Sequence, residues 1–277
     1  MSGRVGKLYR SLVAAAFLFL FSPCRAALRI VSLAPATTEI LFALGLDQEV
    51  VGVSLYCDHP LQARTKAKVG TFSRPDAEKI LLLKPDVVFG TGHEQAPAVN
   101  ALRRLKLRVV VSDPADLIGL YDSIEEIGRL TGREKEASAL VEQMKRRVEQ
   151  VTARTRTIPE ERRPKVFVEV WHTPLMTAGN GSFVDELVRL AGGVNIASGA
   201  PRPYSFFTAE EVLQGRPDCV ILTYPGGEDR VLNRLGWSQV PAVLNHRIYD
   251  DIDPSLILRP GPRIVEGLEQ IQKRLYP

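Results

Sequence analysis

The chain has 277 residues, 25% of them charged and 45% hydrophobic, and carries a formal net charge of +4. A chain of this length forms one large domain or two domains of ordinary size. The excess positive charge comes from the first 26 residues, which include Arg4, Lys7, Arg10 and Arg25 but no acidic residue. The rest of the chain is neutral (4 − 4 = 0), so net charge gives no support for a nucleic acid or an anionic membrane as partner.

Residues 1–26 have the pattern of a secretory signal peptide. Their basic start is followed by an apolar core, residues 12–21, that is too short to span a bilayer. Cys24-Arg25-Ala26 then places small residues at the two positions that a signal peptidase reads. We expect cleavage after Ala26 and a soluble periplasmic protein. A lipid anchor on Cys24 is the alternative, which Pro23 disfavours.

Apolar runs and helical segments alternate in the first part of the mature chain. Strands are expected at residues 29–33, 50–53, 87–89 and 108–111. Between them, Pro35 and Thr37 begin a helix that Gly45 ends, and another helix covers about Ala96 to Leu105. This alternation predicts a largely parallel sheet with helices on both faces.

One segment of the chain occurs twice. Residues 77–88 return 132 residues later as residues 209–220, with six of twelve positions identical. Each copy is typical of a short helix, a Pro-Asp break and a buried strand. The spacing is too long for a solenoid, so we expect two similar α/β lobes with a ligand cleft between them. The alternative is that this common α/β pattern arose twice by chance.

The middle of the chain contains two helical stripes of apolar residues instead of strands. The first runs from Leu117 to Leu130, and the second belongs to a helix from Arg133 to about Thr155, roughly 33 Å long at about 1.5 Å per residue. Strand–helix alternation resumes at residue 166 and ends in a helix from Arg263 to Leu275. Because no Gly/Ser-rich linker occurs, the long helix is expected to connect the lobes stiffly.

These patterns divide the chain into four parts. We expect a signal peptide at residues 1–26, an N-terminal α/β lobe at 27–113, a helical segment with the interlobe helix at 114–163, and a C-terminal α/β lobe at 164–277. The predicted fold class is α/β: two similar lobes with central, mostly parallel sheets flanked by helices, joined by one long helix.

Motifs of catalysis and metal binding are missing from the sequence. Gly90-Thr91-Gly92 hints at a dinucleotide loop, but Gln95 stands where the third glycine is required. No phosphate-binding loop, nucleophile elbow or His-Glu-x-x-His motif occurs, and the four histidines lack metal-site spacing. We therefore expect no enzyme activity, catalytic cofactor or metal site. Cys219 lies in an apolar run and Cys57 in a polar loop of the other lobe, so no disulfide is expected.

Four motifs together resemble one family of exported binding proteins. They are residues 30–39, residues 51–60, both copies of the repeat, and Arg259-Pro260-Gly261-Pro262-Arg263. From about Arg29 to Leu275 the chain resembles the helical-backbone (class III) solute-binding proteins of ABC importers, and most of all the periplasmic vitamin B12-binding proteins. The resemblance implies a monomer that captures a small molecule between its lobes and delivers it to a permease without chemistry.

The resemblance also implies which residues contact the ligand, expected to be cobalamin or a related corrinoid. Aromatic rings line the cleft in the family, Trp171 lies in a rim segment at residues 169–176, and Arg259 matches a residue that reaches polar ligand edges. The expected ligand-binding residues are Tyr56, Phe72, Trp171, Met176, Tyr204, Phe206, Asp253 and Arg259. Thr91 stands where the family can carry Trp, which leaves the ligand's identity open. The alternative role of these aromatic residues is in the core.

The repeat gains a function from the same resemblance. In this family each lobe offers one exposed glutamate to arginines of the permease subunits, and Glu78 and Glu210 hold the matching positions. Both lie in the first turn of a predicted helix, where a carboxylate also stabilises the helix dipole by about 0.3–1 kcal/mol. Capping is therefore the alternative, and the pairing across two lobes favours docking.

Other ligands and one other function are alternatives to the corrinoid. A ferric-siderophore carrier would need cationic or Tyr side chains facing an anionic complex, and a haem carrier would need an axial ligand such as Tyr56 or His93. A zinc or manganese receptor would need three or four converging ligands. A secreted metal-dependent hydrolase is the alternative from a different class, for which no catalytic constellation is present.

Overall fold

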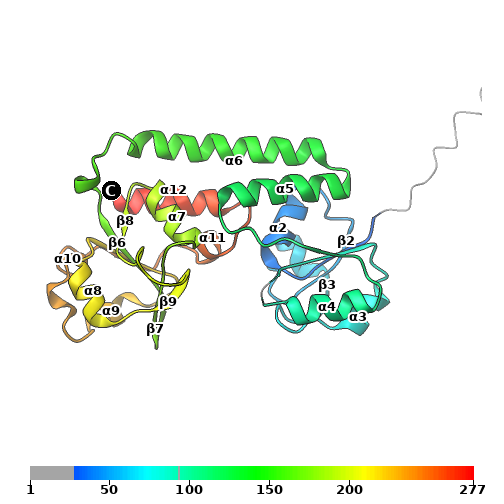
Figure 1. Ribbon diagram of the computed structural model, residues 1–277, viewed down its shortest axis with the longest axis horizontal. Coiled ribbons are helices and arrows are strands. Elements are labelled where there is room, and N and C mark those ends of the chain that lie inside the picture. Colours follow the sequence, from blue (N-terminus) through cyan, green and yellow to red (C-terminus); the bar gives the residue numbers. More distant parts are fainter. Residues whose placement is uncertain (1–27, 93) are drawn as a thin grey trace, which may run out of the picture.

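The computed structural model describes residues 28–92 and 94–277 as two α/β lobes beneath a layer of long helices (Figure 1). Each lobe contains one mostly parallel sheet flanked by helices, which confirms the predicted fold class. The predicted signal peptide with Cys24, and also His93, lie outside the described residues. Within the described part of the chain, no helix combines the length and apolarity needed to cross a membrane.

The sheet of the N-terminal lobe is parallel throughout, in the order β3-β2-β1-β4-β5. Its strands are β1 (Ile30–Ser32), β2 (Val50–Val53), β3 (Ala67–Lys68), β4 (Val87–Gly90) and β5 (Val109–Val111). The flanking helices are α2 (Pro35–Ala43), the 3₁₀ helix η1 (Leu61–Thr65), α3 (Ala77–Leu82) and α4 (Ala96–Arg104). Strands β1 and β4 are buried on both faces, which explains their continuous apolar runs.

The sheet of the C-terminal lobe has the order β11-β10-β6-β7-β9, with β8 beside β6. Its strands are β6 (Lys165–His172), β7 (Leu175–Ala178), β8 (Val194–Asn195), β9 (Tyr204–Phe206), β10 (Cys219–Leu222) and β11 (Ile248–Tyr249). Its helices are α7 (Phe183–Leu190), α8 (Ala209–Gly215), α9 (Glu228–Leu232), η3 (Trp237–Gln239), α10 (Pro241–Leu244), α11 (Ser255–Leu258) and α12 (Ile264–Leu275). The β6-β7-β9 part is antiparallel, a feature that the sequence patterns did not predict.

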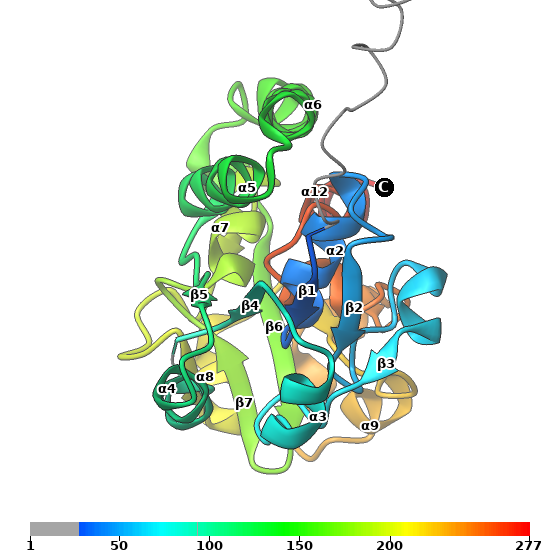
Figure 2. The same ribbon diagram turned by 90° about the vertical axis from the view of Figure 1, so that its right-hand side faces the viewer.

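Helices α5 (Leu117–Thr131) and α6 (Glu134–Thr155) form the predicted helical segment, which the short η2 (Glu160–Arg162) follows. Helix α6 runs above both lobes and contacts α5 over one lobe and α7 and α12 over the other (Figure 1). Figure 2 shows α5, α6 and α12 together on one side of the molecule, with α3 and α4 on the opposite side. The turn between α5 and α6 needs Gly132, whose φ of 73° is left-handed.

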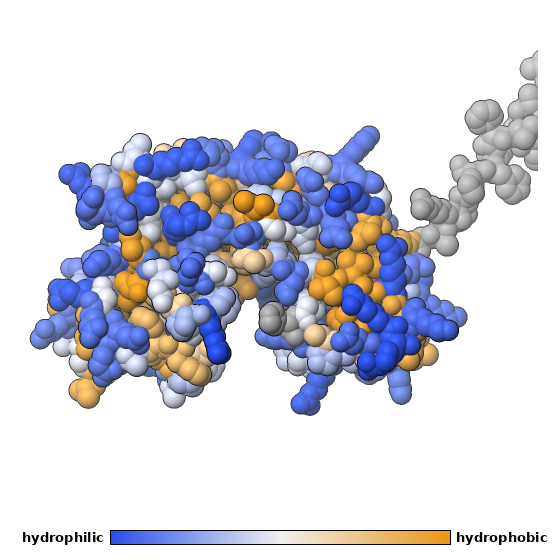
Figure 3. Space-filling model, viewed as in Figure 1, coloured by the Kyte–Doolittle hydropathy of each residue, from blue (hydrophilic) through white to orange (hydrophobic). Residues whose placement is uncertain are grey.

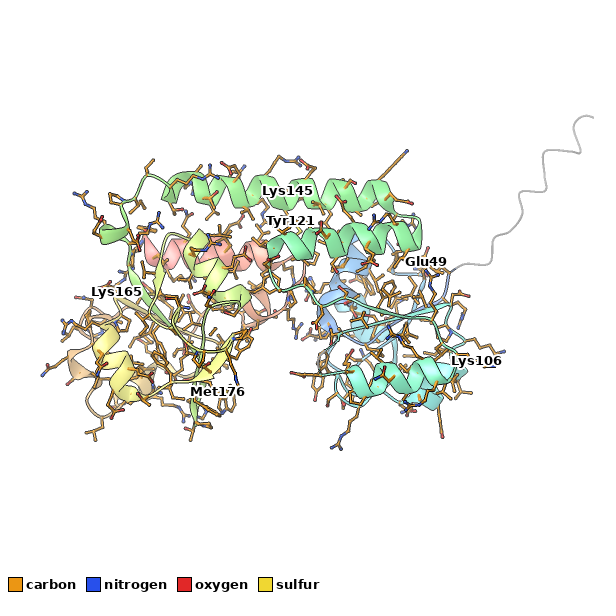
Figure 4. The ribbon with its side chains drawn as sticks, viewed as in Figure 1. Glu49, Lys106, Tyr121, Lys145, Lys165 and Met176 are labelled. Carbon is orange, nitrogen blue, oxygen red and sulfur yellow. The ribbon has the colours of Figure 1, made fainter. Side chains whose placement is uncertain are left out.

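Polar contacts fix α6 to its neighbours. Arg147 forms a bidentate pair with Glu269 of α12, with both N–O distances at 2.8 Å. On the other half, the Lys145 ammonium lies 5.5 Å from the centre of the Tyr121 ring of α5 (Figure 4). The 22-residue helix α6 is therefore attached to α5 over one lobe and to α12 over the other, as a stiff connection between the lobes requires.

The two repeat copies form the same connection between a helix and the central strand of each lobe. A left-handed residue follows each helix: Lys84, two residues after α3, has a φ of 45°, and Arg216, directly after α8, has a φ of 46°. The following aspartates each accept a backbone N–H at the start of a central strand: Asp86 from Arg29 at 2.7 Å and Asp218 from Lys165 at 2.8 Å. The shared Pro-Asp therefore positions β1 and β6 in the same way, which favours two related lobes over chance. The exact domain boundaries stay a prediction.

Candidate functional site

A cleft of about 630 Å³ lies between the two lobes, within the usual range of ligand pockets. The hollow between the lobes is visible in Figure 3. The N-terminal lobe lines the cleft with Ala34, Pro35, Ala36, Tyr56, Phe72, Thr91, Glu94 and Asp113, and the C-terminal lobe with Tyr204, Leu258, Arg259 and Pro260. Most of the former follow the carboxyl ends of parallel strands, which meet at one edge of a sheet.

A second hollow of similar volume, about 650 Å³, lies between α6 and α12. Its lining includes the Arg147–Glu269 pair, Arg154 and Lys273, and it receives no residue from the N-terminal sheet or its loops. The interlobe cleft, with aromatic side chains from both lobes, is therefore the candidate ligand site.

Four of the predicted ligand residues line this cleft: Tyr56, Phe72, Tyr204 and Arg259. Tyr56 and Tyr204 keep 56% and 43% of their surface exposed, so both rings are accessible to a ligand in the cleft. The partly buried position of Tyr204 raises the pKa of its phenol. Thr91, the position where the family can carry Trp, also lies in the lining.

Gln95 organises the N-terminal wall of the cleft. Its fully buried side chain donates to the carbonyl oxygens of Leu33 at 3.0 Å and Phe72 at 2.8 Å, and accepts the Thr91 N–H at 2.9 Å. Three loops that line the cleft are thereby tied to one amide, whose donors and acceptor are all used. In the sequence, Gln95 is notable only as the residue that replaces the third glycine of a dinucleotide loop, and no local pattern predicts its structural role.

Trp171, Met176 and Phe206 form a row across β6, β7 and β9, because Trp171 pairs with Met176 and Met176 with Phe206. Directly paired residues share one face of a sheet. Tyr204 lies on the same face of β9, two residues from Phe206, and Figure 4 shows Met176 at the edge of its lobe nearest the other lobe. The row does not line the cleft itself but extends outward from Tyr204.

The Trp171 ring has its own contacts at this rim. It stacks on His172 with ring centres 4.8 Å apart, and its indole N–H donates to the Thr173 carbonyl at 3.1 Å. With 47% of its surface exposed, it remains available to a ligand larger than the cleft. Asp253 takes no part in the lining: one of its oxygens accepts the Ser255 N–H and the other lies 3.9 Å from Arg263.

Two arginines of the motif at residues 259–263 bridge the lobes. Arg263 donates to both oxygens of Glu39, at 2.9 and 2.7 Å, and Glu39 is almost fully buried in α2. Arg259 donates to Asp58 at 2.6 Å and lies 3.6 Å from Glu39. The hydrogen bond from Arg259 lowers the pKa of Asp58. Sequence reasoning missed Glu39, Arg263 and Asp58, because their partners lie 201 and 224 residues away.

Both described cysteines are free and buried. Cys57 lies in the loop after β2, as expected, but it is buried and belongs to the hydrophobic core, where Thr38 donates to its sulfur at 3.1 Å. Burial raises the pKa of both thiols, that of Cys219 to about 12. Among the residues that the structure describes, no three His, Cys, Asp or Glu side chains are grouped to hold a metal ion.

Comparisons with known proteins identify the family. A protein-family model described as "Periplasmic binding protein" matches residues 30–254 of the chain. The chain belongs to this family. It is 34% identical over 254 residues, 90% of this chain and 80% of the relative, to the ABC transporter substrate-binding lipoprotein YvrC of Bacillus subtilis. A vitamin B12-binding protein of Vibrio cholerae is 29% identical over 266 residues, 94% of this chain and 95% of the relative.

The solved structure of the periplasmic haem-binding protein HutB of Vibrio cholerae has a TM-score of 0.81 and 28% identity, and covers 91% of this chain and 100% of that one. The protein is thus a substrate-binding protein of the ABC-importer class, with the helical-backbone fold. Its family is a class of solute-binding proteins and not of enzymes, and its partners are a small molecule and a permease.

We expect the substitution Glu39→Gln to lower the free energy of unfolding by about 3 kcal/mol, because it leaves the mostly buried Arg263 without its charged partner. Glu49→Gln is the matched control: its pair with Arg133, at 3.3 Å, is more exposed and should contribute about 1 kcal/mol or less. Urea unfolding of both variants checks this. Equal losses in the two would contradict a special role for the interlobe pair.

Proposed function

We propose that the cleft binds cobalamin or a related corrinoid for delivery to an ABC permease. The composition of the cleft lining carries the proposal. Both lobes contribute aromatic rings to it, and Arg259, the one cation among the described lining residues, is already neutralised by its bond to Asp58. A flat macrocycle without carboxylates suits this lining. The vitamin B12-binding relative, aligned over almost its whole length, supports the same ligand.

Affinity would come from apolar contact. Each large ring can bury about 150–250 Å², and apolar surface contributes about 25 cal/mol per Å² removed from water. Tyr56 and Phe72 offer rings from one lobe and Tyr204 from the other, while Trp171 would cover the outer part of a ligand that extends past the cleft. Because α6 holds both lobes, little ordering entropy is lost on binding.

Haem is the second candidate, favoured by the similarity to HutB and by two tyrosines in the lining. A haem iron would need a phenolate or imidazole ligand. The raised pKa of Tyr204 disfavours its phenolate. Tyr56 remains a possible ligand, and His93 lies outside the described residues. The acidic Glu94 and Asp113 in the lining also oppose the carboxylates of haem and anionic ferric siderophores.

We also propose the periplasm as the site of action, with a monomer that begins after Ala26. The predicted signal peptide supports export. The Bacillus subtilis relative is named a lipoprotein, so a lipid anchor on Cys24 remains the alternative form.

Cyanocobalamin should bind one per protein and quench the fluorescence of Trp171, since this ring is exposed at the rim while Trp237 is fully buried in the core. The variant Trp171→Phe should lose most of the quenching and weaken binding by about tenfold or less. Calorimetric and fluorescence titrations with cyanocobalamin, and with haemin in parallel, check this. Saturable binding of haemin without binding of cyanocobalamin would show that the ligand is haem and not a corrinoid.

The permease would contact Glu78 and Glu210. Both are exposed and lie in the first turns of α3 and α8, and neither has a hydrogen-bond or ion-pair partner among the described side chains. The helix starts are already capped by other residues, Asp76 in α3 and Thr208 with Glu211 in α8. Capping therefore does not require Glu78 or Glu210, which supports a role in docking.

Glu210→Ala and Glu78→Ala should each reduce uptake by the reconstituted importer, and the double variant more, with ligand affinity unchanged. The neighbouring Glu211→Ala is the matched control, because Glu211 completes the capping box: it should lower stability by about 1 kcal/mol and leave uptake intact. Uptake and urea unfolding are measured for each variant. Full uptake by the double variant would rule out docking through these residues.

A further inference from the structure

We infer that Asp58 determines the ligand specificity of the cleft: by neutralising Arg259 it makes the cleft favour ligands with neutral edges over ligands with carboxylates. This inference rests on the proposed function, because it assumes a macrocyclic ligand in the interlobe cleft. It goes further by assigning a selectivity role to a residue that is not itself part of the cleft lining.

Asp58 is paired with the Arg259 guanidinium across the two lobes. Asp58 lies in the loop after β2, and Arg259 directly follows α11 in the other lobe. The two terminal nitrogens of Arg259 lie 2.6 and 3.4 Å from the two oxygens of Asp58, while Arg259 itself lines the cleft. Asp58 therefore occupies the bidentate position that a ligand carboxylate would take.

Glu39 is not free to replace Asp58 as the partner of Arg259, because Arg263 already binds both of its oxygens. Glu39 lies 3.6 Å from Arg259 but is bound at 2.9 and 2.7 Å by Arg263. The two arginines and the two carboxylates, Asp58 and Glu39, therefore have a net charge of zero. Arg64 of η1 lies close to the Asp58 loop and donates to the Asp58 carbonyl at 3.2 Å without entering the cleft lining.

The rest of the lining adds only negative charge among the described residues. Glu94 and Asp113 line the cleft and have no described cation partner. A ligand carboxylate would have to displace Asp58 and would still face these two acids. An amide edge avoids this conflict, because Arg259 has five N–H donors and those not used by Asp58 can bind an amide oxygen. The cleft therefore discriminates by charge at one edge of the ligand.

The test compares two ligands that differ at a single group: cyanocobalamin and its monocarboxylic acid, in which one side-chain amide is hydrolysed. Wild-type protein should bind the acid more weakly than the amide, and Asp58→Asn should reduce that preference by about tenfold by freeing Arg259. Haemin and its dimethyl ester form a second pair, in which the same variant should improve binding of the free acid relative to the ester.

Two variants isolate the mechanism. Asp251→Asn removes an acid that pairs with Arg274 outside the cleft and should leave the preference unchanged. Asp58→Asn combined with Arg259→Gln should abolish the gain, because the released cation is gone. Melting temperatures of the variants exclude a general loss of structure.

The outcomes separate the inference from the proposed function. If cyanocobalamin fails to bind but the haemin pair shows the expected change in Asp58→Asn, the corrinoid is wrong and the role of Asp58 holds. If cyanocobalamin binds and Asp58→Asn leaves both preferences unchanged, the inference is wrong and the proposed function holds. Binding of neither macrocycle overturns both.

Discussion

The buried pair between Glu39 and Arg263 is the contact on which the shape of the cleft depends. Glu39 belongs to a helix of the N-terminal lobe and Arg263 directly precedes α12 in the C-terminal lobe, so one bidentate ion pair joins the two lobes. Replacing one partner would leave a charge in a mostly buried position, which is costly. The pair also holds Glu39 close enough to support Arg259, the cation that faces the ligand.

Helix α6 provides a second constraint on the arrangement of the lobes. It is attached to α5 over one lobe and to α12 over the other, and Arg147 with Glu269 ties it to the same helix that follows Arg263. A long helix attached over both lobes and an ion pair between the lobes leave little freedom for the lobes to rotate. A preformed cleft of this kind binds a rigid, flat ligand with a small entropic cost.

The sequence was sufficient to predict the elements of the fold, because apolar runs and helical stripes are local signals. The parallel strands, the long helix and the doubled Pro-Asp connection all follow from them. The antiparallel β6-β7-β9 part was not predicted, because the two residues between β6 and β7, Thr173 and Pro174, lack the glycine typical of a tight hairpin, and β9 pairs with β7 only after α7 and β8. The resemblance supplied Tyr56, Phe72, Tyr204 and Arg259, which the structure brings into one cleft. Gln95, Asp58 and Glu39 could not be found, because their roles arise from tertiary contacts across many residues.

The central claim, that the lobes are held at a fixed separation, is tested most directly by a distance measurement across the cleft. Spin labels can be placed on introduced cysteines at Leu82 and Leu235, which lie in different lobes and are 79% and 95% exposed, while the native Cys57 and Cys219 are buried. Pulsed electron paramagnetic resonance then gives the distribution of distances with and without saturating cyanocobalamin. We expect one narrow distribution that does not change on binding. A shift to a shorter distance with ligand would show that the lobes close, and would contradict a preformed cleft.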